Sequence, residues 1–254
     1  MDDTPLPLTD HLQELRKRIG RILVAWIVAT SLAWTYSEEI FSALLAPAVA
    51  ALGPGARLQA ISPAEIFFTY FKSALLAGFV ISAPVIFWQI WAFIGPGLYP
   101  SEKKAALPFV FVSSLLFVGG GVFAHQLVFP SVFTFFASFG SDFVAPAWTM
   151  AEVFSLTTQL LLAFGVCFEM PVVVFFVAMS GIVTPRQLFG WTKYAVLVSF
   201  IVAAVLTPTP DMLTQTLLAG PLIALYLLGV AVAWMFVRKK PKVTSAEKSV
   251  ATTG

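Results

Sequence analysis

Long apolar runs, separated by charged or Pro/Gly-rich segments, recur along this chain of 254 residues. A run of about 18 or more apolar residues is long enough to cross the hydrocarbon core of a bilayer as a helix. Charged residues make up only 11% of the sequence, whereas soluble domains carry about 25%. This composition excludes a soluble fold, and no alternating pattern favours a β-barrel. The sequence therefore predicts an all-α integral membrane protein.

The breaks between the runs predict six transmembrane helices, preceded by a helix in residues 1–18 and followed by a basic, disordered tail in residues 238–254. The first span is expected to be retained, because no small-residue cleavage site follows it. The third is expected to stop at Pro130. The fifth is short, since its residues rise only about 20 Å against a core of about 30 Å. The expected spans are residues 19–36, 68–94, 107–129, 153–180, 194–206 and 212–237.

The lysines and arginines predict the orientation. Thirteen of the fifteen lie in segments that six spans place on one side of the membrane, and only Arg57 and Lys72 do not. Positive charges accumulate on the cytoplasmic side of membrane proteins. Both termini are therefore expected to be cytoplasmic.

Two glutamates on this predicted cytoplasmic side are candidates for binding a cationic ligand. Glu14 lies four residues before Arg18 on a predicted helix, so a surface ion pair also explains it. Glu102 follows Ser101 and can lie in the first turn of a capped helix, where a carboxylate is favoured. Two carboxylates suit a ligand with two guanidinium groups, because Arg–carboxylate pairs are often bidentate. The apolar neighbours in the sequence are Phe93, Leu98 and Tyr99.

Glu169 is the one acidic residue within "LLAFGVCFEMPVVVFF". A carboxylate at this depth costs about 2.5–3.5 kcal/mol on insertion scales. Pro171 frees the carbonyl of Cys167 and is expected to kink the helix beside Glu169. Both a buried, hydrogen-bonded glutamate and a functional group in a groove fit this pattern. The residues expected on the same helix face are Ser155, Thr158, Leu162 and Gly165.

The segment "LTPTPDMLTQTLL" joins the last two predicted spans. Asp211 can cap the final helix. Thr207 and Gln215 place polar groups beside this turn. Elsewhere the sequence has no HExxH, GxSxG, Walker loop or cysteine–histidine cluster, so we expect no enzymatic activity, metal or cofactor.

Four segments together resemble the TatC family, the multi-spanning subunit of the twin-arginine protein translocase. They are "HLQELRKR", "FIGPGLYPSEKK", "FGVCFEMPV" and "LTPTPDMLTQTLLAGP". The resemblance covers about residues 8–237, in the order of the family. It implies a concave, glove-like bundle of six helices in the inner membrane of a prokaryote, with both termini in the cytoplasm.

The resemblance also implies the ligand and its site. TatC proteins recognise folded cargo by a signal peptide with two adjacent arginines, and they use the proton-motive force rather than a cofactor. Glu14 and Glu102 match the carboxylates that receive those arginines. The residues that match the surroundings of this site are Arg16, Phe93, Leu98 and Tyr99.

A second set of residues resembles the family's contacts with other subunits. Glu169 matches a glutamate inside the concave face, and Pro47 a proline of the first outer loop. Thr207 and Gln215 resemble the contact site for single-span TatA- and TatB-type subunits, and Asp211 lies in the same turn. The resemblance further implies self-association in a multi-copy complex and contact with membrane lipids, but no nucleic-acid partner.

The leading hypothesis is a signal-peptide receptor and core subunit for the export of folded proteins. The alternative is a proton-coupled secondary transporter in which Glu169 relays protons. That alternative predicts an internal repeat with broken helices in both halves, and the two halves of this sequence differ in loop length. A purely structural membrane scaffold is a third possibility, and it would tolerate loss of both Glu14 and Glu102.

Overall fold

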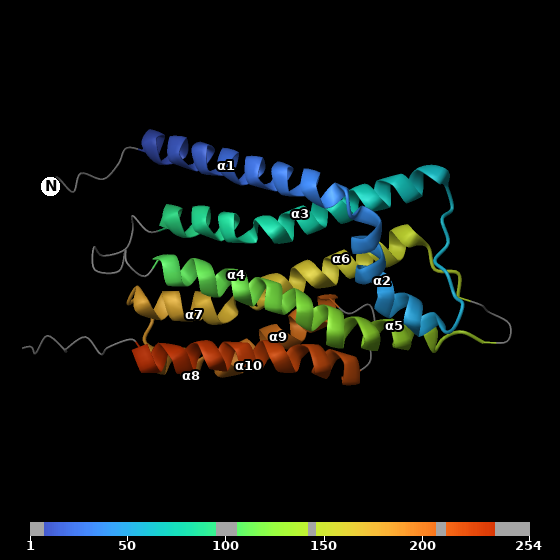
Figure 1. Cartoon of the computed structure of the whole chain (residues 1–254). Coiled ribbons are helices and arrows are strands. Elements are labelled where there is room, and N and C mark those ends of the chain that lie inside the picture. Colours follow the sequence, from blue (N-terminus) through green and yellow to red (C-terminus); the bar gives the residue numbers. More distant parts are fainter. Residues whose placement is uncertain (1–7, 95–105, 142–145, 207–211, 237–254) are drawn as a thin grey trace, which may run out of the picture.

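The computed structural model describes residues 8–94, 106–141, 146–206 and 212–236. Nearly all of these residues are helical, and most of the helices run side by side in one bundle (Figure 1). The helices in chain order are α1 (Leu8–Trp34), α2 (Ser37–Leu52), α3 (Pro63–Ile94), α4 (Ala106–Phe123), the π-helical turn η3 (Ala124–Val128), α5 (Phe129–Ala137), α6 (Met150–Cys167), α7 (Met170–Met179), α8 (Pro185–Gly190), α9 (Thr192–Leu206) and α10 (Met212–Phe236).

The two ends of the bundle are called the α8 end and the α2 end. α1 begins at the α8 end, and α3, α7 and α10 end there (Figure 1). The described residues contain four helical rods that are long and apolar enough to span a membrane, at 63–94, 108–137, 150–179 and 215–236. α1 and α2 are joined by a bend of 87°. With α1 and the shorter α9, this arrangement matches the predicted all-α membrane fold.

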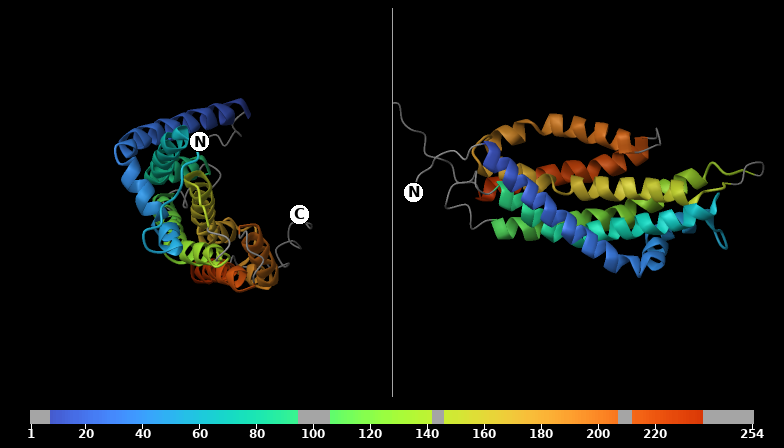
Figure 2. Two further views of the ribbon diagram at one scale, coloured as in Figure 1. Left: turned by 90° about the vertical axis from the view of Figure 1, so that its right-hand side faces the viewer. Right: turned by 90° about the horizontal axis from the view of Figure 1, so that it is seen from above.

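The helices form a curved row rather than a closed ring. Viewed along the bundle, α1 lies at one edge of the row and the hairpin of α9 and α10 at the other (Figure 2). This hairpin reaches less far towards the α2 end than the other rods do (Figures 1 and 2). α9 has 15 residues and therefore rises only about 22 Å, as its short sequence predicted.

α2 lies between α1 and α3 in the chain and packs across the α2 end of the bundle (Figure 1). Its buried side chains Phe41, Leu45 and Ala48 recur at helical spacing, which is typical of a helix with one apolar face. They belong to the main core together with Val128 and Phe133. α2 is therefore part of the core of the bundle.

The third rod does not stop at Pro130, as the sequence suggested. Helix α5 continues to Ala137, with Pro130 in its first turn. Immediately before it, residues 124–128 form the π-helical turn η3. The N–H of Phe129 bonds the Ala124 carbonyl across five residues, so the helix continues through Pro130, which lacks only the bond of its own nitrogen. The wider π-turn thus lets the helix pass the proline instead of ending at it.

The fourth rod is broken beside Glu169, as Pro171 predicted. α6 ends at Cys167, and α7 begins at Met170. Pro171 lies in the first turn of α7 and is buried. Glu169 is consequently placed at a helix break inside the bundle rather than on a continuous helix.

The segments before α3 and before α6 are joined at the α2 end by a clasp of hydrogen bonds. The backbone N–H of Gln59 donates to the carbonyl of Trp148 at 2.9 Å, and Met150 N–H donates to the Gln59 carbonyl at 2.9 Å. Glu65 adds two further bonds, accepting from Ala151 N–H at 3.0 Å and from Ile61 N–H at 2.7 Å. Glu65 therefore links the first turn of α3 to the first turn of α6.

Candidate functional site

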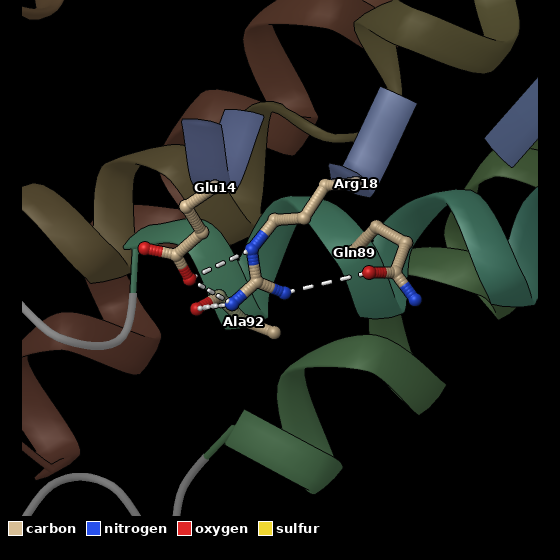
Figure 3. Close-up of polar contacts among 4 residues, drawn as sticks. All are labelled: Glu14, Arg18, Gln89 and Ala92. Atoms are coloured by element: carbon tan, nitrogen blue, oxygen red, sulfur yellow. Dashed lines mark hydrogen bonds and ion pairs between the residues drawn. The ribbon is translucent and has the colours of Figure 1, made fainter. Parts of the chain in front are cut away.

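The predicted carboxylate Glu14 lies at the α8 end, in a cluster that joins α1 to α3. Arg18 Nε donates to Glu14 Oε1 at 3.0 Å, and Arg18 Nη2 forms an ion pair with the same oxygen. The guanidinium also donates to Gln89 Oε1 at 3.4 Å and to the Ala92 carbonyl at 3.0 Å (Figure 3). The predicted ion pair between Glu14 and Arg18 is confirmed, and it is part of a contact between helices.

This cluster is half-open to its surroundings. The Arg18 side chain is 15% exposed and that of Glu14 is 30% exposed, whereas Gln89 is buried. Among the described residues, the hydrogen bonds to Glu14 all reach Oε1. The second carboxylate oxygen of Glu14, Oε2, therefore accepts no described hydrogen bond, and Glu14 is the more exposed residue of the pair.

The structure places some of the other predicted ligand residues near this cluster. Phe93 follows Ala92 in the last turn of α3 and is half-buried. Arg16 is exposed on α1 and is turned away from Glu14 by about 200° of helix rotation. The remaining predicted members lie outside the described residues, and they are Leu98, Tyr99 and Glu102.

Glu169 lies deeper in the bundle, beside the core of α3 and α4. Ser113 of α4 is next to its carboxyl group, and the Trp91 indole N–H donates to the Ser113 hydroxyl at 3.2 Å. Glu169 Oε1 is buried and has no hydrogen-bond partner among the described residues. An unpaired buried oxygen is costly, so the break between α6 and α7 holds a carboxyl oxygen whose hydrogen-bonding capacity is unused among the described residues.

The residues expected on the same helix face as Glu169 have two different environments. Gly165 is buried against Phe117, whose ring would lie 2.7 Å from a Cβ placed on the glycine. Gly165 therefore serves close packing of α6 on α4. Thr158 has a buried hydroxyl without a described partner, and Ser155 is exposed.

The other predicted partner-contact residues lie on different elements. Gln215 Nε2 of α10 donates to the Phe200 carbonyl of α9 at 3.1 Å, which ties the short hairpin together. Pro47 lies inside α2 and is half-buried. No described hydrogen bond or ion pair joins Pro47, Glu169 and Gln215, so the structure does not gather them into one site. Thr207 and Asp211 lie outside the described residues.

Known proteins share both the sequence pattern and the helical bundle of this chain. The family model described as Sec-independent protein translocase protein (TatC) matches residues 10–221. The chain belongs to the TatC family. The TatC protein of Desulforapulum autotrophicum is 41% identical over 234 residues, covering 92% of this chain and 86% of that protein. The TatC protein of Helicobacter pylori strain J99 is 42% identical over 239 residues, covering 92% and 91%.

A solved TatC structure confirms the fold. A crystal structure described as the twin-arginine translocase receptor TatC superposes with a TM-score of 0.74 at 34% identity, covering 90% of this chain and all of that chain. A second crystal structure, described as the same receptor in DDM, gives a TM-score of 0.75 at 34% identity, with 88% and 99% covered. The six-helix, glove-like membrane fold is therefore shown for this TatC chain.

Membership of the TatC family defines the general function. The chain is a subunit of the Sec-independent (Tat) protein translocase, and it acts in a complex with other Tat subunits. TatC is a protein-transport component and not a known enzyme. This identity speaks against the alternative of a proton-coupled secondary transporter.

Sequence reasoning missed two features of this TatC chain that pair residues far apart in sequence. Gln89 and Ala92 bind Arg18 across more than 70 residues. His125 Nε2 lies 2.9 Å from the Ala43 carbonyl, the carbonyl that Pro47 leaves free because proline lacks an N–H. The four-residue spacing of Ala43 and Pro47 is the sequence signal for the free carbonyl, but nothing local to η3 indicates His125 as its partner.

Proposed function

We propose that this TatC chain is the receptor for twin-arginine signal peptides and the core on which the other Tat subunits assemble. The observation that carries the proposal is the Glu14 carboxylate of α1 at the α8 end, which Arg18 links to the last turns of α3 and whose Oε2 accepts no described hydrogen bond. One arginine of the peptide binds Glu14, and the other binds Glu102. The apolar part of the peptide then inserts along the bundle.

The side from which a signal peptide arrives supports an inner-membrane location with the α8 end in the cytoplasm. A peptide that is recognised before transport must reach its receptor from the cytoplasm. The basic segments of the chain lie on the same side by the distribution of Lys and Arg. We therefore assign both termini to the cytoplasm and place the clasp around Glu65 on the opposite side.

The single-span TatA- and TatB-type subunits are assigned to α9 and α10. Gln215 of α10 supplies one polar group for this contact, and Thr207 and Asp211 supply two more from the sequence between α9 and α10. Glu169 supplies an unpaired acceptor for a donor on an inserted helix. The proton-motive force drives transport once these subunits have assembled around the cargo, and several copies of the chain associate in the complex.

The proposal is tested by crosslinking of a twin-arginine peptide to the full chain in membranes. We expect Glu14→Ala and Glu102→Ala each to lower crosslinking at least tenfold, because a charge-assisted hydrogen bond contributes about 1.5–3 kcal/mol. Glu39→Ala is the matched control, since it removes an exposed glutamate of α2 at the other end of the bundle. Unchanged crosslinking in both test variants would overturn the carboxylate site.

A further inference from the structure

Arg18 is the residue that connects the predicted ligand carboxylate to the rest of the bundle. Its guanidinium binds Glu14 on α1, and on α3 it binds the buried Gln89 side chain and the Ala92 carbonyl (Figure 3). Ala92 lies in the last turn of α3, where carbonyls lack intrahelical partners and a cation is favoured by the helix dipole. Arg18 therefore bonds a backbone carbonyl at the end of α3 as well as the Glu14 carboxylate of α1.

We propose that Arg18 is a positioning residue for Glu14, pinning the start of α1 to the end of α3 and leaving Glu14 Oε2 for the arginine of a signal peptide. This inference rests on the proposed receptor function. It assigns to Arg18 a role distinct from that of Glu14, because Arg18 acts through the carboxylate and does not itself contact the ligand.

A contact near Glu14 is needed to position the start of α1, because the other contacts described here between α1 and α3 lie far from Glu14. The Trp26 indole N–H donates to the Leu75 carbonyl at 2.9 Å, and the backbones of the two helices approach each other closely at Thr30 and Gly78. α1 packs chiefly against α3, and the large apolar side chains along its outer face are exposed. Without Arg18, the start of α1 has no described polar tie to the bundle.

The part of α1 between Trp26 and Glu14 is long enough for a small tilt of the helix to affect binding. Glu14 lies twelve residues from Trp26, which corresponds to about 18 Å along the helix. A tilt of about 5° at Trp26 would move the Glu14 carboxylate by about 1.6 Å. Binding groups have to be held within about 0.5 Å of their productive geometry. A small tilt of α1 is therefore sufficient to disable the site.

The contacts favour positioning over competition with the ligand. Both guanidinium nitrogens that bind Glu14 use Oε1, so an arriving arginine can bind Oε2 without displacing Arg18. Two of the three acceptors of Arg18 belong to α3, and these hold it in place whatever happens at Glu14. An internal competitor would instead have to leave the carboxylate when the ligand binds.

The test measures helix position and binding in the same purified full-length protein. Spin labels at Leu12→Cys and Ile90→Cys, both exposed positions, report the distance between α1 and α3 after Cys167→Ser removes the native thiol. Affinity is measured for a synthetic twin-arginine signal peptide and for the same peptide with two lysines. The variants are Arg18→Gln, Arg18→Lys and the matched control Lys17→Gln, which removes a neighbouring exposed charge.

We expect Arg18→Gln to broaden the distance distribution and to weaken twin-arginine binding at least tenfold, with Arg18→Lys in between and Lys17→Gln unchanged. The proposal is overturned if Arg18→Gln keeps a narrow distribution, or if it binds the peptide as tightly as the parent. Tighter binding would identify Arg18 as a competitor. If the parent protein binds both peptides equally, the receptor function fails, whereas the distance measurement still decides the positioning role.

Discussion

Replacing Gly78 by alanine tests the close packing of α1 against α3 at Thr30. A Cβ at this position would lie 2.7 Å from both the Cα and the backbone nitrogen of Thr30, and closer still to its Oγ1. Real Cβ contacts are rarely shorter than 3.4 Å, so α1 and α3 would have to separate by about 0.7 Å. Backbone atoms cannot rotate away as a flexible side chain does, and overpacking of this kind costs about 1–3 kcal/mol.

Gly119→Ala is the matched control, because Gly119 is also inside a helix and a Cβ added there would meet no atom within 4 Å. Alanine favours a helix over glycine by about 1 kcal/mol, and this gain applies to both variants. We therefore expect Gly119→Ala to be neutral or stabilised and Gly78→Ala to be less stable than it by the overpacking cost of about 1–3 kcal/mol. Denaturant unfolding in detergent micelles, followed by circular dichroism, measures the difference. Equal stability of the two variants would refute the close approach of α1 and α3.

Three further predictions follow from individual contacts. Glu65→Ala should speed amide hydrogen exchange in the segments before α3 and α6, and Glu65→Gln should do so less because it keeps one acceptor. Unchanged exchange would show that the clasp does not depend on Glu65. His125→Ala should lower the free energy of unfolding by about 1 kcal/mol when Pro47 is present. It should lower it by less in the Pro47→Ala background, because the restored N–H can bond the Ala43 carbonyl. Equal losses in both backgrounds would exclude an energetic coupling between His125 and Pro47. Glu169→Gln should keep the fold and peptide binding but reduce crosslinking to a single-span partner, and full crosslinking would remove the carboxylate from that contact.

The membrane architecture was predictable because it depends on local sequence. Apolar runs of sufficient length specify spanning helices whatever they pack against. Pro171 predicted the break between α6 and α7 because a proline in a helix always frees a carbonyl. Pro130 misled the same reasoning, since the helix continues from the π-turn η3 into α5 through the proline.

The candidate site was predictable only in part. The Glu14–Arg18 pair follows from four-residue spacing on one helix, and the structure confirms it. The contacts of Arg18 with Gln89 and Ala92 depend on how α1 crosses α3, and no local pattern records that crossing. The same reason explains why the sequence could not decide whether Gly165 lines a cavity or a helix contact, whereas the structure packs it against Phe117 of α4.

The most direct test of the receptor function is to map where a signal peptide touches the chain. A twin-arginine peptide with a photoreactive group beside the arginine pair is bound to the full-length protein in lipid nanodiscs, and the crosslinked residues are identified by mass spectrometry. We predict crosslinks to the start of α1 and to the end of α3 around Phe93, and their loss when the two arginines are replaced by lysines. Crosslinks confined to other parts of the bundle, or equal labelling by the lysine peptide, would contradict the proposed receptor.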